Sequence, residues 1–180
     1  FTDFTYRSGL GGEGLNYLSW GGDFADLDND GDQDLFVTNG HMDENVADAR
    51  PALAYAQPNQ VFTNGGSGVF DDVSASAGDG LQLRNVSRGA AFGDFDNDGR
   101  LDVLIANCGQ SPDLLRNASS TGNHWLTIET VGTTSNRDGI GARVRVLANG
   151  VWQTREVRSA SSLRRASLSF RLTCAAPSMK

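Results

Sequence analysis

Two short aspartate-rich segments have a spacing that suits a metal ion. Both follow the pattern Asp-x-Asp-x-Asp-Gly-x-x-Asp. Alternate carboxylates converge inside a tight loop, the glycine permits a sharp turn, and oxygen ligands in this number suit Ca²⁺ better than Zn²⁺ or copper. The pattern predicts one Ca²⁺ site per loop, with ligands at positions 1, 3, 5, 7 and 9: Asp26, Asp28, Asp30, Asp32 and Asp34 in the first loop, and Asp94, Asp96, Asp98, Arg100 and Asp102 in the second.

Position 7 differs between the loops, and this difference fits a ligand that uses its backbone. Asp32 in the first loop becomes Arg100 in the second, and a carbonyl oxygen can be supplied by either residue. The loops are not EF-hands, which need Glu at position 12 and a following helix. Val37 and Ile105 stand there instead, in strand-like runs. The alternative is a pair of solvated acidic turns, but two copies with the same flanks favour calcium.

The elements that position these loops repeat at an offset of 68 residues. Each loop precedes a short apolar run, 35–38 in the first copy and 103–106 in the second. Residues 60–73 read as a strand, a glycine turn and a strand, and residues 41–58 read as a loop with a short helix. Short strands with glycine turns predict an all-β protein built as propeller blades or a β-solenoid.

The charge divides the chain into two parts. The net charge is −7, but residues 1–118 hold 19 Asp+Glu against 6 Lys+Arg, and residues 119–180 hold 3 against 9. This asymmetry predicts two modules. The acidic balance argues against nucleic-acid binding, and no run of 18 apolar residues predicts a membrane span.

The second module also reads as β structure. Val144 and Val146 alternate with Arg143 and Arg145, as in a half-buried strand. Asn-Gly at 149–150 predicts a hairpin turn, after which the chain runs back. We interpret the arginines of this ribbon as its solvated face, with an acidic ligand or the acidic blade module as the alternative partner.

Both modules resemble known families. Phe92-Gly-Asp-Phe-Asp-Asn-Asp-Gly-Arg-Leu-Asp-Val resembles the FG-GAP/VCBS repeat, the calcium-loop blade of integrin-like β-propellers. Segments 122–128, 135–146 and 153–162 are similar to the ASPIC/UnbV domain, which follows such propellers in the cartilage acidic protein family and its bacterial relatives. The resemblance implies a partial integrin-like propeller of about two blades over residues 1–118, followed by a small β-rich ASPIC/UnbV domain over residues 119–180.

The resemblance also implies a location and a role. We expect a secreted, extracellular protein, or a periplasmic or cell-surface one, in which structural Ca²⁺ supports recognition or adhesion to a protein or glycan ligand. The alternatives are an accessory protein or enzyme of a biosynthetic pathway, and a calcium-dependent glycan binder. No nucleophile–base pair is evident, and His41 and His124 have no ligand spacing, so we do not expect an enzyme.

Two further expectations concern the ends and the cysteines. With about two blades, we expect this chain to be a fragment of a longer propeller protein. The tail 163–180 is atypical of the family, and a reading-frame slip near residue 163 is one hypothesis for it. Cys108 follows a predicted strand, so we expect a buried thiol, with a bridge to Cys174 as the alternative.

Overall fold

The computed structural model describes residues 1–12, 16–120, 122–134, 136–148 and 150–157, together with the strand at 167–172. The chain divides into two compact units. One comprises residues 1–25, 32–91 and 102–116, and the other comprises residues 26–31, 92–101 and 117–180. Nearly all regular structure is β, so the predicted all-β class is confirmed.

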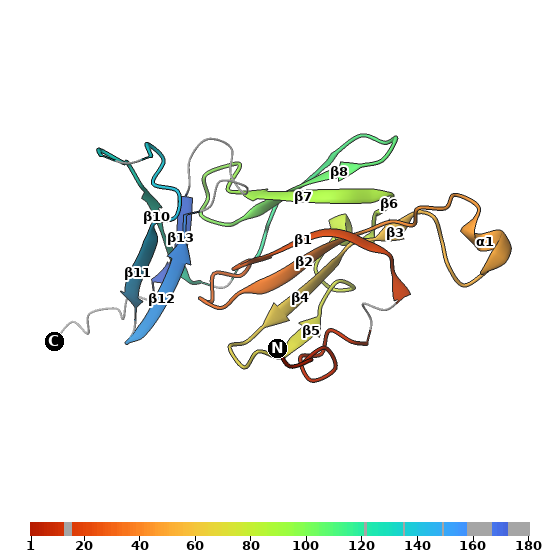
Figure 1. Cartoon of the computed structure of the whole chain (residues 1–180), viewed down its shortest axis with the longest axis horizontal. Coiled ribbons are helices and arrows are strands. Elements are labelled where there is room, and N and C mark those ends of the chain that lie inside the picture. Colours follow the sequence, from red (N-terminus) through yellow and green to blue (C-terminus); the bar gives the residue numbers. More distant parts are fainter. Residues whose placement is uncertain (13–15, 121, 135, 149, 158–166, 173–180) are drawn as a thin grey trace. The chain divides into compact units, whose positions relative to one another are not determined.

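The larger sheet is a four-stranded antiparallel meander (Figure 1), with strand order β1-β2-β4-β5. Its strands are β1 (Ser19–Ala25), β2 (Asp34–Asn39), β4 (Gln60–Asn64) and β5 (Phe70–Asp72). Leu35 faces Phe24 on one neighbour and Phe62 on the other. The glycine turn predicted within residues 60–73 joins β4 to β5, so that hairpin prediction is confirmed.

A three-stranded sheet repeats the start of this meander. Its order is β7-β8-β9, with strands β7 (Ser87–Gly93), β8 (Asp102–Asn107) and β9 (Asp113–Leu115). Strands β7 and β8 begin and end 68 residues after β1 and β2, which is the offset of the sequence repeat. Open sheets of this kind fit a partial propeller-like β fold, as the resemblance implies.

Short elements lie between the strands of these sheets along the sequence. They are α1 (Val46–Ala49), the paired strands β3 (Gln57–Pro58) and β6 (Arg84–Asn85), and a 3₁₀ helix (Asp79–Gln82). The short helix predicted within residues 41–58 is therefore confirmed. No helix in the described part of the chain is long and apolar enough to cross a membrane.

The C-terminal strands form two antiparallel pairs. Strand β10 (His124–Glu129) pairs with β13 (Ser167–Leu172), and β11 (Arg143–Ala148) pairs with β12 (Val151–Glu156). Val157 is the buried centre of a small apolar cluster with Ile128, Val144 and Val146. The alternation predicted for this ribbon is confirmed, with the valines inward and Arg143 and Arg145 exposed.

One sequence expectation is wrong, and another lies outside the described residues. Cys108 is exposed rather than buried, because the chain leaves β8 at Asn107 and turns through Gly109, whose φ is +67°. The proposed bridge from Cys108 involves Cys174, which lies outside the described residues, as do 163–166 and 173–180 of the atypical tail.

Candidate metal centres

The repeated strand pairs present the two aspartate loops in the same way. The first loop joins β1 to β2 and the second joins β7 to β8. The residue at position 9, Asp34 or Asp102, is the first residue of the second strand and is almost fully buried. A strand therefore fixes the last carboxylate of each loop, while the turn has to bring the earlier ones to it.

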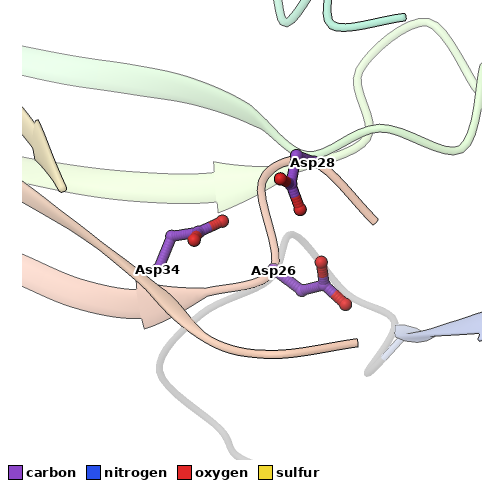
Figure 2. A group of neighbouring side chains, drawn as sticks. All are labelled: Asp26, Asp28 and Asp34. Carbon is purple, nitrogen blue, oxygen red and sulfur yellow. The ribbon is translucent and has the colours of Figure 1, made fainter. Parts of the chain in front are cut away.

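Each loop brings three of its carboxylates together. Asp26, Asp28 and Asp34 each offer an oxygen, and these oxygens lie within 4.8 Å of one another. Figure 2 shows these side chains gathered where the loop turns, with the Asp34 carboxylate directed toward the other two. The equivalent trio in the second loop, Asp94, Asp96 and Asp102, meets the same distance criterion. A Ca²⁺ ion takes oxygen ligands at 2.3–2.6 Å, so oxygens this close can share one ion.

Residues with positive φ make the turn. Gly31 and Gly99 have φ of +95° and +85°, and Asn29 and Asn97 have φ of +57° and +58°. Glycine adopts such angles freely, and asparagine tolerates them better than most residues. The glycine that the motif places at position 6 thus has the conformational role expected of it.

Positions 5 and 7 stand outside these two trios. In the second loop, the Arg100 guanidinium pairs with the carboxylate of Asp98, and Arg100 Nε donates to the carbonyl of Asn117 at 2.8 Å. The coordination roles expected for Asp30, Asp98 and the position-7 carbonyls of Asp32 and Arg100 remain predictions.

The first carboxylate of each loop is held differently. In the second loop, Asp94 accepts the backbone N–H of Asp98 on Oδ1 and that of Gly99 on Oδ2, both at 2.9 Å. In the first loop, Asp26 accepts the N–H of Gly31 on Oδ2 at 3.0 Å, but its Oδ1 is buried without a hydrogen-bond partner among the described residues. Loops with the same sequence pattern therefore differ at the residue where each begins.

Ionising the buried carboxyl of Asp26 costs free energy when no cation lies beside its Oδ1. Its side chain is 3% exposed, and burial raises the pKa of Asp26 to about 7, against the opposing effect of the Arg155 charge. Asp30 and Asp28 raise this pKa further by charge repulsion. A buried carboxylate oxygen without a donor is rare in native proteins, and a bound cation would satisfy it. The donor set of the first loop therefore fits a hard divalent ion such as Ca²⁺.

Two side chains that the sequence reasoning missed hold the loops. Asn117 Nδ2 donates to the carbonyls of Leu27 at 2.6 Å and Leu101 at 3.1 Å, one in each loop. Arg155, on β12, donates to the carbonyl of Gly31 at 3.2 Å and lies 3.5 Å from Asp26 Oδ2. Neither residue belongs to an aspartate loop, so the sequence offers only a polar residue type, partly buried in the structure, as a signal of these contacts.

Two stretches of the chain match models of known protein families. Residues 38–105 match the FG-GAP-like repeat, and residues 132–174 match the ASPIC and UnbV family. The comparison with curated proteins found no match. The first match includes the second aspartate loop and the β4–β5 hairpin, and the second match includes the β11–β12 hairpin. We refer to residues 132–174 as the ASPIC and UnbV segment, after the family that they match.

Proposed function

We propose that this chain is a calcium-binding, extracellular recognition module in which the ions are structural. The observation that carries the proposal concerns the buried Oδ1 of Asp26, which lies beside the carboxylates of Asp28 and Asp34 and has no hydrogen-bond partner within the described ranges of the chain. The FG-GAP-like and ASPIC and UnbV matches support a β-rich recognition module of the extracellular type. The ligand it recognises, an extracellular protein or a glycan, is part of the proposal.

A structural role follows from where the loop carboxylates sit. Asp34 begins β2, and its Oδ1 also accepts the backbone N–H of Asn64 at 3.0 Å, at the end of β4. An ion held by Asp34 would therefore brace the strands as well as the loop. Two like charges about 4 Å apart repel by about 4 kcal/mol at an effective dielectric constant of about 20. A divalent ion among three carboxylates would convert that repulsion into attraction.

The proposed location agrees with this chemistry. Calcium sites of extracellular modules work at dissociation constants of roughly 10⁻⁴ to 10⁻³ M, weaker than those of intracellular sensors. Loops that carry a structural ion in such surroundings need no tighter binding. A protein of this kind would keep its fold outside the cell and loosen when calcium is withdrawn.

Calorimetric titration of the chain with Ca²⁺ tests the proposal, alongside thermal melts in calcium and in chelator. We expect saturable binding and a higher melting temperature in calcium. A free concentration about ten times Kd adds about 1.4 kcal/mol per site, or roughly 3–6 °C in a chain of this size. Mg²⁺ at the same concentration is the matched control, since it demands octahedral geometry. Equal melting temperatures in calcium and in chelator, with no heat of binding, would refute the proposal.

A further inference from the structure

Arg155 stands apart from the other arginines of its hairpin. The Arg143 side chain is 75% exposed, whereas that of Arg155 is 17% exposed and its partner Asp26 is 3% exposed. The guanidinium reaches Asp26 Oδ2 and the carbonyl of Gly31. This contact joins the ASPIC and UnbV segment to the first aspartate loop across 129 residues of sequence, and it favours the acidic module as the partner of this arginine.

The contact anchors one oxygen of Asp26 and leaves the other available. Oδ2 accepts the N–H of Gly31 and faces Arg155, while Oδ1 has no partner in the described part of the chain. In the second loop, both oxygens of the equivalent Asp94 accept backbone N–H groups from within the loop. The first loop thus lacks one internal donor at this carboxylate, and Arg155 from β12 lies beside the carboxylate instead.

We propose that Arg155 is a positioning residue for the calcium site of the first loop, and that loading of this loop and placement of the β11–β12 hairpin are therefore coupled. The inference rests on the proposed function, because it assumes that Ca²⁺ binds there. Outer-shell partners that orient a ligand typically contribute 10- to 100-fold to metal affinity. Coupling of this kind is reciprocal, so the ion also favours the position of the hairpin in which Arg155 reaches the loop.

The charge of the loop accommodates both cations. Residues 26–34 carry five carboxylates, whereas Ca²⁺ and a guanidinium together bring three positive charges. The loop remains negative with both in place, so neither cation has to leave for the other to bind. The backbone carbonyl that Arg155 contacts is that of Gly31 at position 6, not the position-7 carbonyl that the motif assigns to the ion.

Calorimetric titration with Ca²⁺ alone tests this role in the full chain. In an Asp94→Asn background, which removes the first ligand of the second loop, the heat reports the first loop. We expect Arg155→Gln to weaken this binding about tenfold, and Arg155→Lys to weaken it less. Arg143→Gln is the matched control, since it removes the same charge from an exposed position of the same hairpin, and it should leave the affinity unchanged.

Hydrogen exchange distinguishes this coupling from an effect confined to the loop, because such an effect would not change amide exchange in the β11–β12 hairpin. Ca²⁺ should slow amide exchange in the β11–β12 hairpin of the Asp94→Asn chain, and Arg155→Gln should abolish that effect. Unchanged or tighter binding in Arg155→Gln would overturn the inference, and tighter binding would show that the arginine competes with the ion. If Arg155→Gln does not fold, as judged by circular dichroism, Arg155→Lys decides by the same two measurements. Absence of Ca²⁺ binding in the unsubstituted chain would instead refute the proposed function.

Discussion

Replacing Asp26 by Asn should stabilise the calcium-free protein and, at the same time, reduce its response to calcium. Burial raises the pKa of Asp26 to about 7 from an ordinary value of 3.8, so the folded loop holds this carboxyl protonated more readily than the unfolded chain does. The stability that this group contributes is fully present below about pH 4 and is lost as the pH rises through 7. At pH 8 the loss amounts to about 4 kcal/mol as an upper bound.

Asparagine keeps the shape of the side chain and carries no charge to desolvate. It can still accept the N–H of Gly31, but it gives up the attraction to Arg155, which offsets part of the gain. We therefore expect Asp26→Asn to raise the calcium-free stability at pH 8 by about 1–3 kcal/mol, or roughly 2–10 °C in melting temperature. At pH 5, Asp26 is still protonated in the folded protein but already ionised in the unfolded chain, so the difference should fall to less than half of its value at pH 8 and should nearly vanish only at about pH 3.

Thermal melts in chelator and in calcium, each at pH 5 and pH 8, measure both effects. Asp94→Asn is the matched control at the equivalent position, because both oxygens of Asp94 accept backbone N–H donors and the substitution removes a charged acceptor. We expect that control to lose about 1–3 kcal/mol in chelator, opposite in sign to Asp26→Asn. Both variants should lose part of the calcium response. If Asp26→Asn lowers the melting temperature in chelator at pH 8 as Asp94→Asn does, the reasoning about the buried carboxylate is wrong.

Two other substitutions probe how the loops are held. Gly99→Ala should destabilise the protein by more than the roughly 1 kcal/mol that a left-handed alanine costs by itself, because a Cβ at this position would overlap the indole of Trp125. Chemical denaturation measures the change, and a decrease in unfolding free energy of 1 kcal/mol or less would contradict the contact. Asn117→Ala removes the donor to the carbonyls of Leu27 and Leu101 and should cost about 1–3 kcal/mol in urea unfolding. Asn117→Asp keeps the size and loses the donor, so it should be no more stable than the alanine variant.

The repeat in the sequence predicted the strand that follows each loop, although it did not indicate the strand that precedes it. Strands β2 and β8 occupy equivalent positions because a similar apolar run follows the same glycine turn, and β1 and β7 pair with them at the same 68-residue offset. The burial of equivalent residues in the two copies is less similar than their secondary structure. Phe36 on β2 is 1% exposed, whereas the equivalent Leu104 on β8 is 44% exposed. Strand formation depends on local pattern, but burial depends on what packs against each face, and a repeat in sequence does not determine this.

The contacts that distinguish the two loops could not be predicted in the same way. Arg155 reads as one more outward arginine of a β ribbon, and its approach to Asp26 depends on chain segments 129 residues apart. Cys108 shows the converse error, since a short apolar strand predicted burial and the thiol lies beyond its end. Periodicity indicates which face a residue occupies, but it does not indicate whether that face meets solvent or another part of the fold.

The two aspartate loops are therefore one motif in two chemical states. In the second loop, arginine is built into position 7, where Arg100 neutralises Asp98 within the loop itself, and backbone donors satisfy both oxygens of Asp94. In the first loop, position 7 is an aspartate, and the positive charge comes from Arg155 on β12. Among the described residues, one buried oxygen of Asp26 has no hydrogen-bond donor. The second loop can therefore balance part of its charge without an ion. The first loop leaves more negative charge and, in the part of the chain that the structure describes, one acceptor without a donor. A bound calcium ion would therefore contribute more there, and Arg155 of the ASPIC and UnbV segment contacts that loop.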